Sequence, residues 1–409
     1  MRLTISLRSS TMNSSIGEVC SRFSSGTALP AKDIHQTGLY PVYGGNGIRG
    51  YTDTYNFDGR CAIIGRQGAL CGNVRYFEGK AFMTEHAIVA VANDKNDSGY
   101  LAYKLMIMNL GKYQGQSAQP GLSVTTLSRL PIRLPDLATQ RKVFSFLNTL
   151  SNKISNNTAV ISQLESLAKT IYDYWFLQFE FPNEEGKPYK SSGGKMVWCE
   201  ELKREIPDGW EVSTLKNMYE IKRGISYSSK DIESGEGIPM INLACIDINR
   251  NYRDGELKYY NRKNAPILDE GDMLIATTDL TRNADIVGCP IITPYDGNKY
   301  TYSMDLARID INCPTLSKWY VYSTLRTESY HNYIKKWASG TNVLHLNLDG
   351  MNWYTILIPD IAVQKTYAGI IEPIVKKQSL LMKENRELSS LRDFLLPMLM
   401  NGQVTFKDN

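Results

Sequence analysis

The chain has 409 residues, more than the roughly 150 of one ordinary domain. A hydrophobic content of 42% suits a globular core, and no apolar run reaches the roughly 20 residues of a membrane span. A net charge of only +4 excludes a polycation that coats nucleic acid by charge alone, so any such binding must be local.

The N-terminal segment and the cysteines indicate a cytoplasmic protein. Residues 1–15 are rich in Ser and Thr and lack the apolar stretch of a secretory signal. The seven cysteines form no CxxC pair and have no nearby histidine at zinc-finger spacing. We therefore expect reduced thiols that mostly pack in the core, no metal site and no contact with a membrane.

The first globular portion, residues 1–134, combines short β-rich runs with one helical segment. Strands are predicted over 61–65, 86–92 and 130–134, and a helix over 100–110. The opening segment near 16–19 is short, which predicts a trimmed opening strand. Helix and strands that follow one another in this way favour an α+β domain.

Polar, glycine-rich turns are the best candidates for a binding surface in this portion. Glycine lets the backbone approach a partner closely, and Arg, Gln and Asn can each read a base edge through two hydrogen bonds. As an alternative to DNA binding, ordinary turn chemistry explains the single glycines equally well. A solvated loop likewise explains the polar composition of 113–119. We select Tyr43, Gly44, Asn46, Arg49, Arg66, Gln67, Asn73, Lys112, Gln116 and Ser117 as candidate DNA contacts.

A long helix is predicted over 135–180. Apolar residues recur at alternating steps of four and three, which is typical of a coiled-coil seam. The seam comprises Val143, Leu147, Leu150, Ile154, Ile161, Leu164, Ala168, Ile171 and Trp175. Asn157 is the one polar residue in this register, either as a tolerated amide or as a device that fixes the register. In the second case, leucine at this position would stabilise the helix pair and loosen its register.

Residues 181–206 are predicted to be a linker, because 181–194 are rich in Gly, Pro, Ser and charge. A second globular portion follows over 207–358, with strands at 273–278 and 307–311 and one helical segment over 317–337. Its polar loops, 277–283 and 335–342, occupy comparable places to those of the first portion. They supply the candidate DNA contacts Thr278, Arg282, Asn283, Lys336, Ser339 and Thr341.

An internal repeat ends in a second long helix, over 359–409. The heptapeptide 134–140, LPDLATQ, recurs as IPDIAVQ at 358–364, and each copy follows a strand-like run and opens a helical segment. The matching seam is noisier and includes the amides Gln378 and Asn385, which we assign with Asn157 to helix register. Pro373 should kink this helix or delay its start.

No catalytic constellation is apparent, and we expect no catalytic residue and no cofactor. The sequence has no GxxxxGKS or GxxxxGKT phosphate-binding loop, no HExxH and no GxGxxG at the end of a predicted strand. The nearest alternative is a metal-dependent DNA nuclease that uses Asp247, Glu256 and Lys258. A protein-binding assembly scaffold is a second alternative.

This organisation resembles the specificity subunits of type I restriction-modification systems. The likeness rests on the repeated Pro-Asp-x-Ala-x-x-Gln motif, the loops at 43–50 and 63–72, the linker into 206–210, and residues 395–402, LLPMLMNG. It implies two α/β target-recognition domains joined by two long antiparallel coiled-coil helices, with a pseudo-two-fold repeat.

The resemblance also implies a function and partners. The chain would recognise a bipartite, non-palindromic sequence in double-stranded DNA and carry out no reaction itself. Two modification subunits, which methylate adenine with S-adenosylmethionine, would dock on the helices. ATP-driven restriction subunits, which translocate DNA, would complete the complex.

Overall fold

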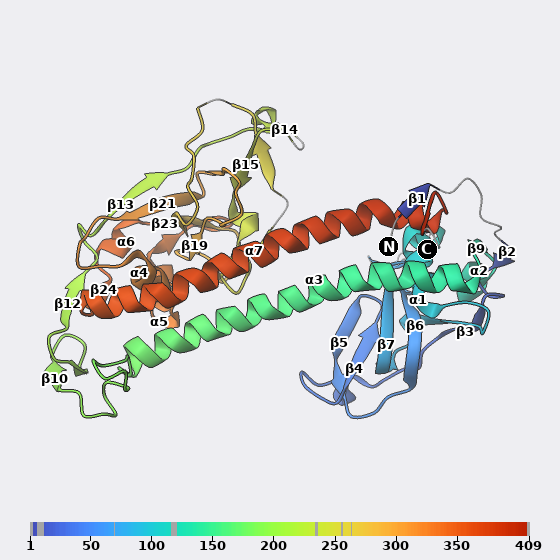
Figure 1. Cartoon of the computed structure of the whole chain (residues 1–409), viewed down its shortest axis with the longest axis horizontal. Coiled ribbons are helices and arrows are strands. Elements are labelled where there is room, and N and C mark those ends of the chain that lie inside the picture. Colours follow the sequence, from blue (N-terminus) through green and yellow to red (C-terminus); the bar gives the residue numbers. More distant parts are fainter. Residues whose placement is uncertain are drawn as a thin grey trace. The chain divides into compact units, whose positions relative to one another are not determined.

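The structure is a computed structural model that describes residues 3–5, 12–68, 70–115, 121–233, 236–254, 257–262 and 264–406 (Figure 1). The chain divides into two compact units, residues 1–154 with 387–409, and residues 155–386. Each unit combines a globular α+β part with segments of two long helices, α3 (Leu137–Tyr172) and α7 (Ile361–Met400). The predicted α+β class with two long helices is confirmed.

The first unit is built on a six-stranded sheet with the order β3-β8-β6-β7-β4-β5. Neighbouring strands are antiparallel except β4 and β7, which are parallel. The strands are β3 (Cys20–Ser25), β4 (Tyr40–Gly44), β5 (Gly47–Thr52), β6 (Phe57–Gly65), β7 (Val74–Met83) and β8 (Ala87–Ala92). Two α-helices, α1 (Ser98–Ile107) and α2 (Val124–Ser128), and the 3-10 helices Ala31–Asp33 and Leu110–Tyr113 complete this part.

The sheet of the first unit is covered on both faces in its centre. Ala62 and Ile64 of β6 belong to the core cluster that contains α1, whereas Cys61 and Ile63 belong to a cluster on other strands. A strand that is buried on both faces has no polar alternation. This explains why residues 61–65 form an uninterrupted apolar run.

Among its described residues, the second unit contains three sheets of three or four strands, besides two strand pairs. The orders of the three sheets are β13-β21-β17-β19, β14-β16-β15-β20 and β18-β23-β22. The strands are β13 (Tyr219–Arg223), β14 (Ile232–Glu233), β15 (Ile238–Ile241), β16 (Lys258–Tyr260), β17 (Met273–Ala276), β18 (Thr278–Asp279), β19 (Pro290–Ile292), β20 (Thr301–Tyr302), β21 (Leu306–Ile311), β22 (Ala338–Ser339) and β23 (Leu344–Leu346). The 3-10 helices Ser229–Asp231 and Leu243–Cys245 lie between them.

The helical segment predicted over 317–337 is helical over most of its length but is not continuous. The segment forms α4 (Lys318–Leu325), α5 (Glu328–Ile334) and a 3-10 turn, Lys335–Trp337, and α6 (Asp349–Asn352) follows. The break falls at Thr327, whose Oγ1 accepts a hydrogen bond from the backbone N–H of Tyr330 at 3.2 Å. A threonine that caps a new helix in this way stops the preceding one, because its own backbone is extended.

The trimmed opening strand predicted for the first unit is wrong. Strand β2 (Met12–Ser15) pairs along its whole length with β9 (Pro131–Leu134). In the second unit β12 (Glu211–Thr214) pairs in the same way with β24 (Thr355–Ile358). The two units therefore open and close with equivalent antiparallel pairs, although their sequences match poorly.

The repeated motif links each long helix to a helix of the adjoining globular part. Gln140 is fully buried, accepts a hydrogen bond from the N–H of Asp97 at 2.9 Å, and donates to the carbonyl of Pro135 at 2.8 Å. Gln364 is also fully buried, accepts from the N–H of Ser317 at 2.8 Å, and donates to the carbonyl of Pro359 at 2.7 Å. Asp97 and Ser317 are the N-cap residues of α1 and α4. The glutamine therefore fastens two helix beginnings together.

The predicted coiled-coil seam is confirmed in both helices. On α3 the buried and half-buried positions include Val143, Leu147, Leu150, Ile154, Asn157, Ile161, Leu164, Ala168 and Ile171. On α7 they include Tyr367, Ile371, Ile374, Gln378, Leu381, Asn385, Leu388, Arg392, Leu395 and Leu399. The beginning of α3 shares a core cluster with the end of α7, and the end of α3 shares one with the beginning of α7, so the helices pack antiparallel.

Pro373 does not delay α7, which begins at Ile361 and continues to Met400. Proline removes the hydrogen bond to the carbonyl four residues earlier, which is that of Gly369. Both residues lie on the exposed face of the helix. Water can therefore bind the carbonyl that loses its helical partner, and the helix tolerates the proline.

The C-terminal end of α7 is capped before the chain forms a last strand. Gly402 has a left-handed φ of 69°, and the N–H of Gln403 donates to the carbonyl of Met398 at 2.9 Å. This pattern is a Schellman cap, which satisfies carbonyls at a helix end. Strand β25 (Val404–Phe406) then pairs with β1 (Leu3–Ile5), a pairing that the sequence did not predict.

The segment predicted as a linker, 181–206, is folded. It contains the hairpin of β10 (Met196–Cys199) and β11 (Arg204–Pro207). The ring of Phe181 stacks on those of Tyr189 and Trp210 at 4.6 and 5.0 Å. Just before it, residues Asp173–Leu177 extend α3 as a π-helix that supplies Trp175 to the same core.

Membrane-spanning helices and disulfides are both missing from the described residues. Within these ranges no helix is both long and apolar enough to cross a membrane. None of the seven cysteines forms a disulfide, and five of them are buried. Burial raises the pKa of the Cys61 and Cys289 thiols to about 12, which keeps them protonated.

Candidate nucleic-acid interface

Two loops of the first unit that the sequence selected, 43–50 and 63–72, lie together, and residues 121–122 contact the second of them. The N–H of Leu122 donates to the carbonyl of Arg66 at 2.9 Å, and Gln67 forms a β-bridge with Gly121. A Cβ atom at Gly65 would lie 2.1 Å from the carbonyl oxygen of Gly45. The glycines are therefore needed for backbone-to-backbone contact between the β4–β5 turn and the loop after β6.

The predicted contact residues of this cluster differ in accessibility. Five have exposed side chains, namely Asn46, Arg49, Gln67, Asn73 and Lys112. Tyr43 is half-buried, with its ring 5.1 Å from that of Phe77, and burial raises the pKa of its hydroxyl. Gly44 is buried beneath the Arg49 side chain. Tyr43 and Gly44 therefore support the turn, and Gln116 and Ser117 lie outside the described residues.

Arg66 and Gln67 point to different partners. The Nη1 of Arg66, which is half-buried, donates to the Ser25 hydroxyl at 3.3 Å. Gln67 is exposed, and its Oε1 lies 2.7 Å from Nδ1 of His86. The Nε2 of His86 lies 3.1 Å from a carboxylate oxygen of Glu85. With this amide orientation the histidine lies between two acceptors, and the Gln67 amino group has no hydrogen-bond partner among the described residues.

Arg75 and His86 belong to this surface, and we did not select them from the sequence. Arg75 is exposed on β7, and its Nη2 donates to the carbonyl of Asn46 at 3.2 Å. Arg75 pairs with Ile63 of β6, and the end of β6 contacts the β4–β5 turn through Gly65 and Gly45, so only the tertiary fold brings Arg75 to the turn. In the sequence, Arg75 is simply an arginine at the start of a strand, and this pattern is too common to identify a binding residue.

In the second unit, the two predicted loops meet in the sheet β18-β23-β22. His345 of β23 is paired with Thr278 on one side and with Ser339 on the other. Ser339, Lys336 and Thr341 are exposed, as is His345, which we did not select from the sequence. Thr278 is buried and so belongs to the frame of this surface.

A buried aspartate organises the loop that carries Arg282 and Asn283. The carboxylate of Asp279 accepts hydrogen bonds from the N–H groups of Thr281, Ile286 and Val287 at 2.6, 2.7 and 2.9 Å. These bonds close the loop below its tip, where Arg282 and Asn283 are exposed. Two side chains that can read base edges are thus held on a preformed loop without glycine.

The three amides assigned to helix register lie on the facing sides of α3 and α7. Asn157 is 3% exposed, and its Nδ2 donates to Oδ1 of Asn385 at 3.0 Å and to Glu384 at 2.8 Å. Gln378 donates to the carbonyl of Ile161 at 3.4 Å. Polar pairs inside an apolar seam favour one alignment over its neighbours, because a shift leaves them without partners.

The nuclease alternative gains no support from the described members of its proposed site. Oδ1 of Asp247 accepts from the N–H groups of Asn249 and Asn251 at 2.8 and 2.9 Å, and Lys258 donates to the Tyr227 hydroxyl at 2.9 Å. Glu256 lies outside the described residues. Across the described ranges, no group of three or more His, Cys, Asp or Glu could hold a metal ion.

Comparison with known proteins identifies the family. The family model of the type I restriction modification DNA specificity domain matches residues 9–166 and 207–390. The specificity subunit of the type I restriction enzyme EcoprrI from Escherichia coli is 38% identical over 142 residues, which are 34% of this chain and 35% of that subunit. The MjaIX specificity subunit of Methanocaldococcus jannaschii is 26% identical over 328 residues, 76% of this chain and 70% of that subunit. The resemblance inferred from the sequence is confirmed.

A solved structure shares the fold. The crystal structure of the type I restriction-modification S subunit from M. genitalium superposes with a TM-score of 0.68 and 16% identity. The alignment covers 99% of this chain and 98% of that one. The fold with two globular parts and two long helices is therefore common to both.

Proposed function

The chain belongs to the family of type I restriction modification DNA specificity domains, and on that premise we propose that it is the DNA-recognising subunit of such a complex. It binds a bipartite, non-palindromic target in double-stranded DNA and carries out no reaction itself. Two modification subunits and the restriction subunits that translocate DNA assemble with it, in the cytoplasm. The methylation and cleavage chemistry belongs to those partners.

The observation that carries this proposal is the duplication of one design. Each stretch matched by the family model contains an opening and closing strand pair, a cluster of polar loops, and a glutamine that fastens a long helix to the globular part. We propose target-recognition domains at 1–134 and 207–358, spacer helices at 135–180 and 359–409, and a connecting segment at 181–206.

Exposed residues of the two loop clusters are the proposed contacts with DNA. Amides and guanidinium groups read base edges, and lysines and small hydroxyl residues position phosphates. The first domain contributes Asn46, Arg49, Gln67, Asn73 and Lys112, together with the half-buried Arg66. Gln116 and Ser117, which lie outside the described residues, are proposed from the sequence alone. The second contributes Arg282, Asn283, Lys336, Ser339 and Thr341. Tyr43, Gly44 and Thr278 shape the loops.

The long helices are proposed to set the distance between the two half-sites. The 36 residues of α3 correspond to about 54 Å at 1.5 Å per residue. Half-sites one turn of B-DNA apart are separated by about 34 Å, so a spacer of this length can span them. The register device formed by Asn157, Gln378 and Asn385 keeps this distance constant.

Selection of bound duplexes from a random pool tests the proposal. The full chain, assembled with its modification subunits, should enrich two different half-sites at a constant separation. Arg282→Ala should relax one half-site only, whereas Lys195→Gln, which removes an exposed ion pair with Asp208, should change nothing. Enrichment without sequence preference would contradict the proposal and favour the scaffold alternative.

The nuclease alternative predicts a different result. If the purified chain itself cleaves DNA with Mg²⁺ and Glu256→Ala abolishes the cleavage, the chain is an enzyme. We expect no cleavage, because its two described members are held by structural hydrogen bonds.

A further inference from the structure

One short loop of the second unit contacts both long helices. Loop 247–254 follows the 3-10 helix Leu243–Cys245 and precedes β16, and it closes on a bridge between Ile246 and Tyr252. Its contact with α3 is made by Asn251 and its contact with α7 by Asp254. These two residues are only three positions apart, so a single rigid loop can fix the globular part to both helices.

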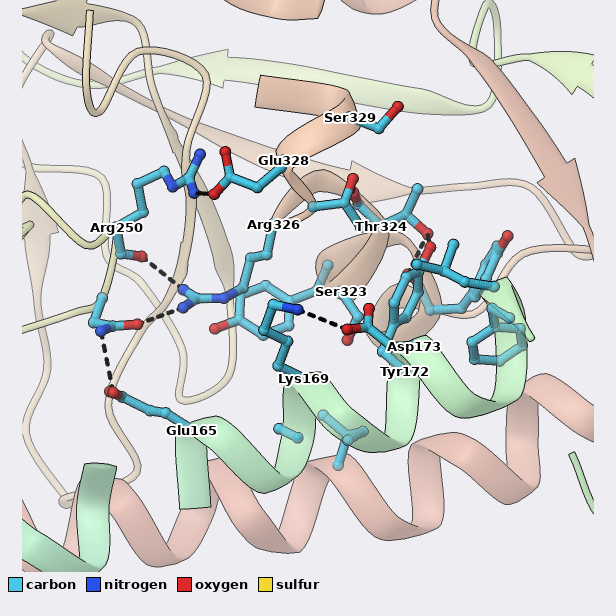
Figure 2. Close-up of a pocket in the computed structure, with 18 of the residues that line it drawn as sticks. Glu165, Lys169, Tyr172, Asp173, Arg250, Ser323, Thr324, Arg326, Glu328 and Ser329 are labelled. Carbon is cyan, nitrogen blue, oxygen red and sulfur yellow. Dashed lines mark hydrogen bonds and ion pairs between the residues drawn. The ribbon is translucent and has the colours of Figure 1, made fainter. Parts of the chain in front are cut away.

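The contact with α3 is a chain of hydrogen bonds (Figure 2). The Nδ2 of Asn251 donates to Oε2 of Glu165 at 3.1 Å. On its other side, Oδ1 of Asn251 accepts from Arg326, which also donates to the carbonyl of Arg250 at 2.6 Å. Arg250 in turn forms an ion pair with Glu328 at the start of α5. The amide of Asn251 thus connects α3 to the helical part of the domain.

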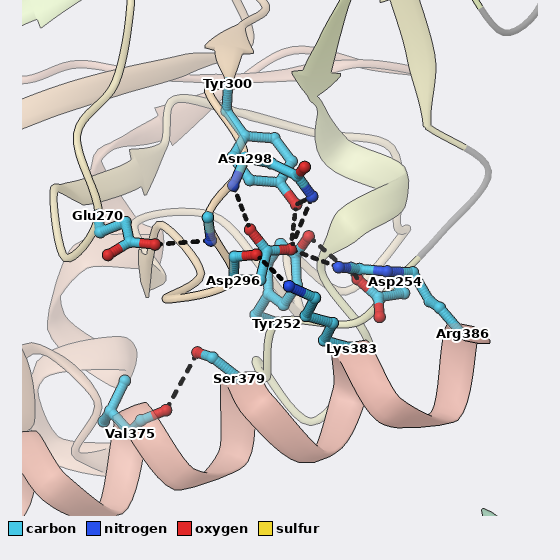
Figure 3. Close-up of polar contacts among 11 residues, drawn as sticks. Tyr252, Asp254, Glu270, Asp296, Asn298, Tyr300, Val375, Ser379, Lys383 and Arg386 are labelled. Atoms are coloured by element: carbon cyan, nitrogen blue, oxygen red, sulfur yellow. Dashed lines mark hydrogen bonds and ion pairs between the residues drawn. The ribbon is translucent and has the colours of Figure 1, made fainter. Parts of the chain in front are cut away.

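The contact with α7 is an ion-pair cluster (Figure 3). The guanidinium of Arg386 pairs with the carboxylates of Asp254 and Asp296, and the side chain of Asp296 is fully buried. Asp296 also accepts a hydrogen bond from the Tyr300 hydroxyl at 2.7 Å, and Lys383 donates to its carbonyl at 2.9 Å. A planar guanidinium that bridges two carboxylates has a defined direction, which a single ammonium does not.

The loop itself is held in one shape. The Asp247 carboxylate accepts from two backbone N–H groups, those of Asn249 and Asn251. Arg250 has a left-handed φ of 66°, and the N–H of Arg253 donates to the carbonyl of Cys245 at 3.0 Å. These internal hydrogen bonds hold the loop in one conformation, so a movement of the helices would move the domain with it.

The described contacts of this loop with α3 and α7 are polar, whereas Ile246 and Tyr252 pack against an apolar cluster of the domain itself. A cavity of about 1100 Å³ lies beside the α3 contact, and Glu165, Lys169, Asn251 and Arg326 line it. Close-packed side chains therefore do not fill the space between the loop and the helix. Loss of Asn251 or Arg386 contacts should let the loop move relative to the helices.

We propose that loop 247–254 is a strut that fixes the angle of the second globular part on α3 and α7, and so limits the half-site separations that the protein accepts. This inference rests on the proposed function. Asn251, Asp254 and Arg386 are positioning residues, because they act through the orientation of a DNA-reading domain. Their loss should alter the tolerance for spacer length and leave the preferred bases unchanged.

The test uses duplexes in which the selected half-sites are separated by spacers of different lengths. Arg386→Gln and Asn251→Ala, in the full chain with its modification subunits, should raise binding of targets one base pair too long or too short by about tenfold relative to the best target, a loss of about 1.4 kcal/mol of discrimination. Glu165→Gln retains an acceptor for Asn251 and should behave as wild type. Lys195→Gln is the control, an exposed ion pair with Asp208 in the same unit.

Two results would overturn the strut. One is an unchanged spacer preference in both variants, and the other is a lost base preference in the second half-site. Hydrogen exchange gives a readout without DNA, because amides of 244–254 should exchange about tenfold faster in Arg386→Gln if opening costs about 1.4 kcal/mol less. Unchanged exchange in Arg386→Gln would reject the strut, whatever the DNA selection shows. A wild-type protein that selects no DNA sequence would instead reject the proposed function.

Discussion

Replacement of Asn157 by leucine is the sharpest test of the polar layer between α3 and α7. The apolar seam alone favours leucine, because burying its side chain contributes about 1.5–3 kcal/mol. The structure reverses this expectation. Asn157 donates to the carboxylate of Glu384 and to the amide oxygen of Asn385. A hydrogen bond to a charged group contributes about 1.5–3 kcal/mol and one between neutral groups about 1 kcal/mol, and the half-buried acceptors would lose this donor in Asn157→Leu.

We therefore expect Asn157→Leu to destabilise the second unit by about 2 kcal/mol, which lowers a thermal midpoint by about 4–8 °C for a domain of this size. The double variant with Asn385→Leu removes the amide acceptor but keeps the Glu384 carboxylate, so it should regain about 1 kcal/mol, and the two changes should couple by about 1 kcal/mol. Thermal unfolding of the four proteins of this cycle measures both values. A higher midpoint for the single variant, or strictly additive changes, would refute the reasoning.

Three further changes have defined outcomes. Asp279→Ala leaves three backbone N–H groups without their acceptor, so it should cost about 2–4 kcal/mol in unfolding experiments and weaken selection of one half-site. Gly402→Ala places a side chain at a left-handed φ of 69°, and a midpoint drop equivalent to about 1 kcal/mol is expected; no drop would argue against the cap. Burial alone would raise the pKa of Asp296, but hydrogen bonds from Tyr300, Asn298 and Arg386 hold it below the usual 3.8. Its contribution to stability is thus present above pH 3.8 and lost as the pH falls through the lower folded pKa, so the midpoints of wild type and Asp296→Asn should differ at pH 7 and converge in acid.

The long helices could be predicted from sequence because their signals are local and repeated. The seam follows from a period of 3.5 residues, and the motif ending in Gln140 recurs at Gln364. The reason for the glutamine was not predictable, because its partners Asp97 and Ser317 lie more than 40 residues away in each half. The repeat therefore indicated that this glutamine is important, but not which residues it contacts.

The binding surface was less predictable, because it depends on which strands become neighbours. Arg66 fits a base-reading pattern in sequence, yet it is half-buried and donates to the Ser25 hydroxyl. Arg75 has no local pattern, yet the position of β7 brings it to the β4–β5 turn. The strut is an extreme case, since Asn251 and Arg386 belong to no motif and only the fold places them at one loop.

The two globular parts keep the same frame while using different means to hold their loops. In the first, glycines such as Gly65 allow backbones to touch, and His86 orients Gln67. In the second, a single buried carboxylate, that of Asp279, ties a loop without glycine. Side chains on surfaces built so differently cannot present the same pattern of donors and acceptors to DNA. A pseudo-symmetric protein of this kind should therefore select two unlike half-sites, and a palindromic target would mean that the exposed loops do not determine the bases.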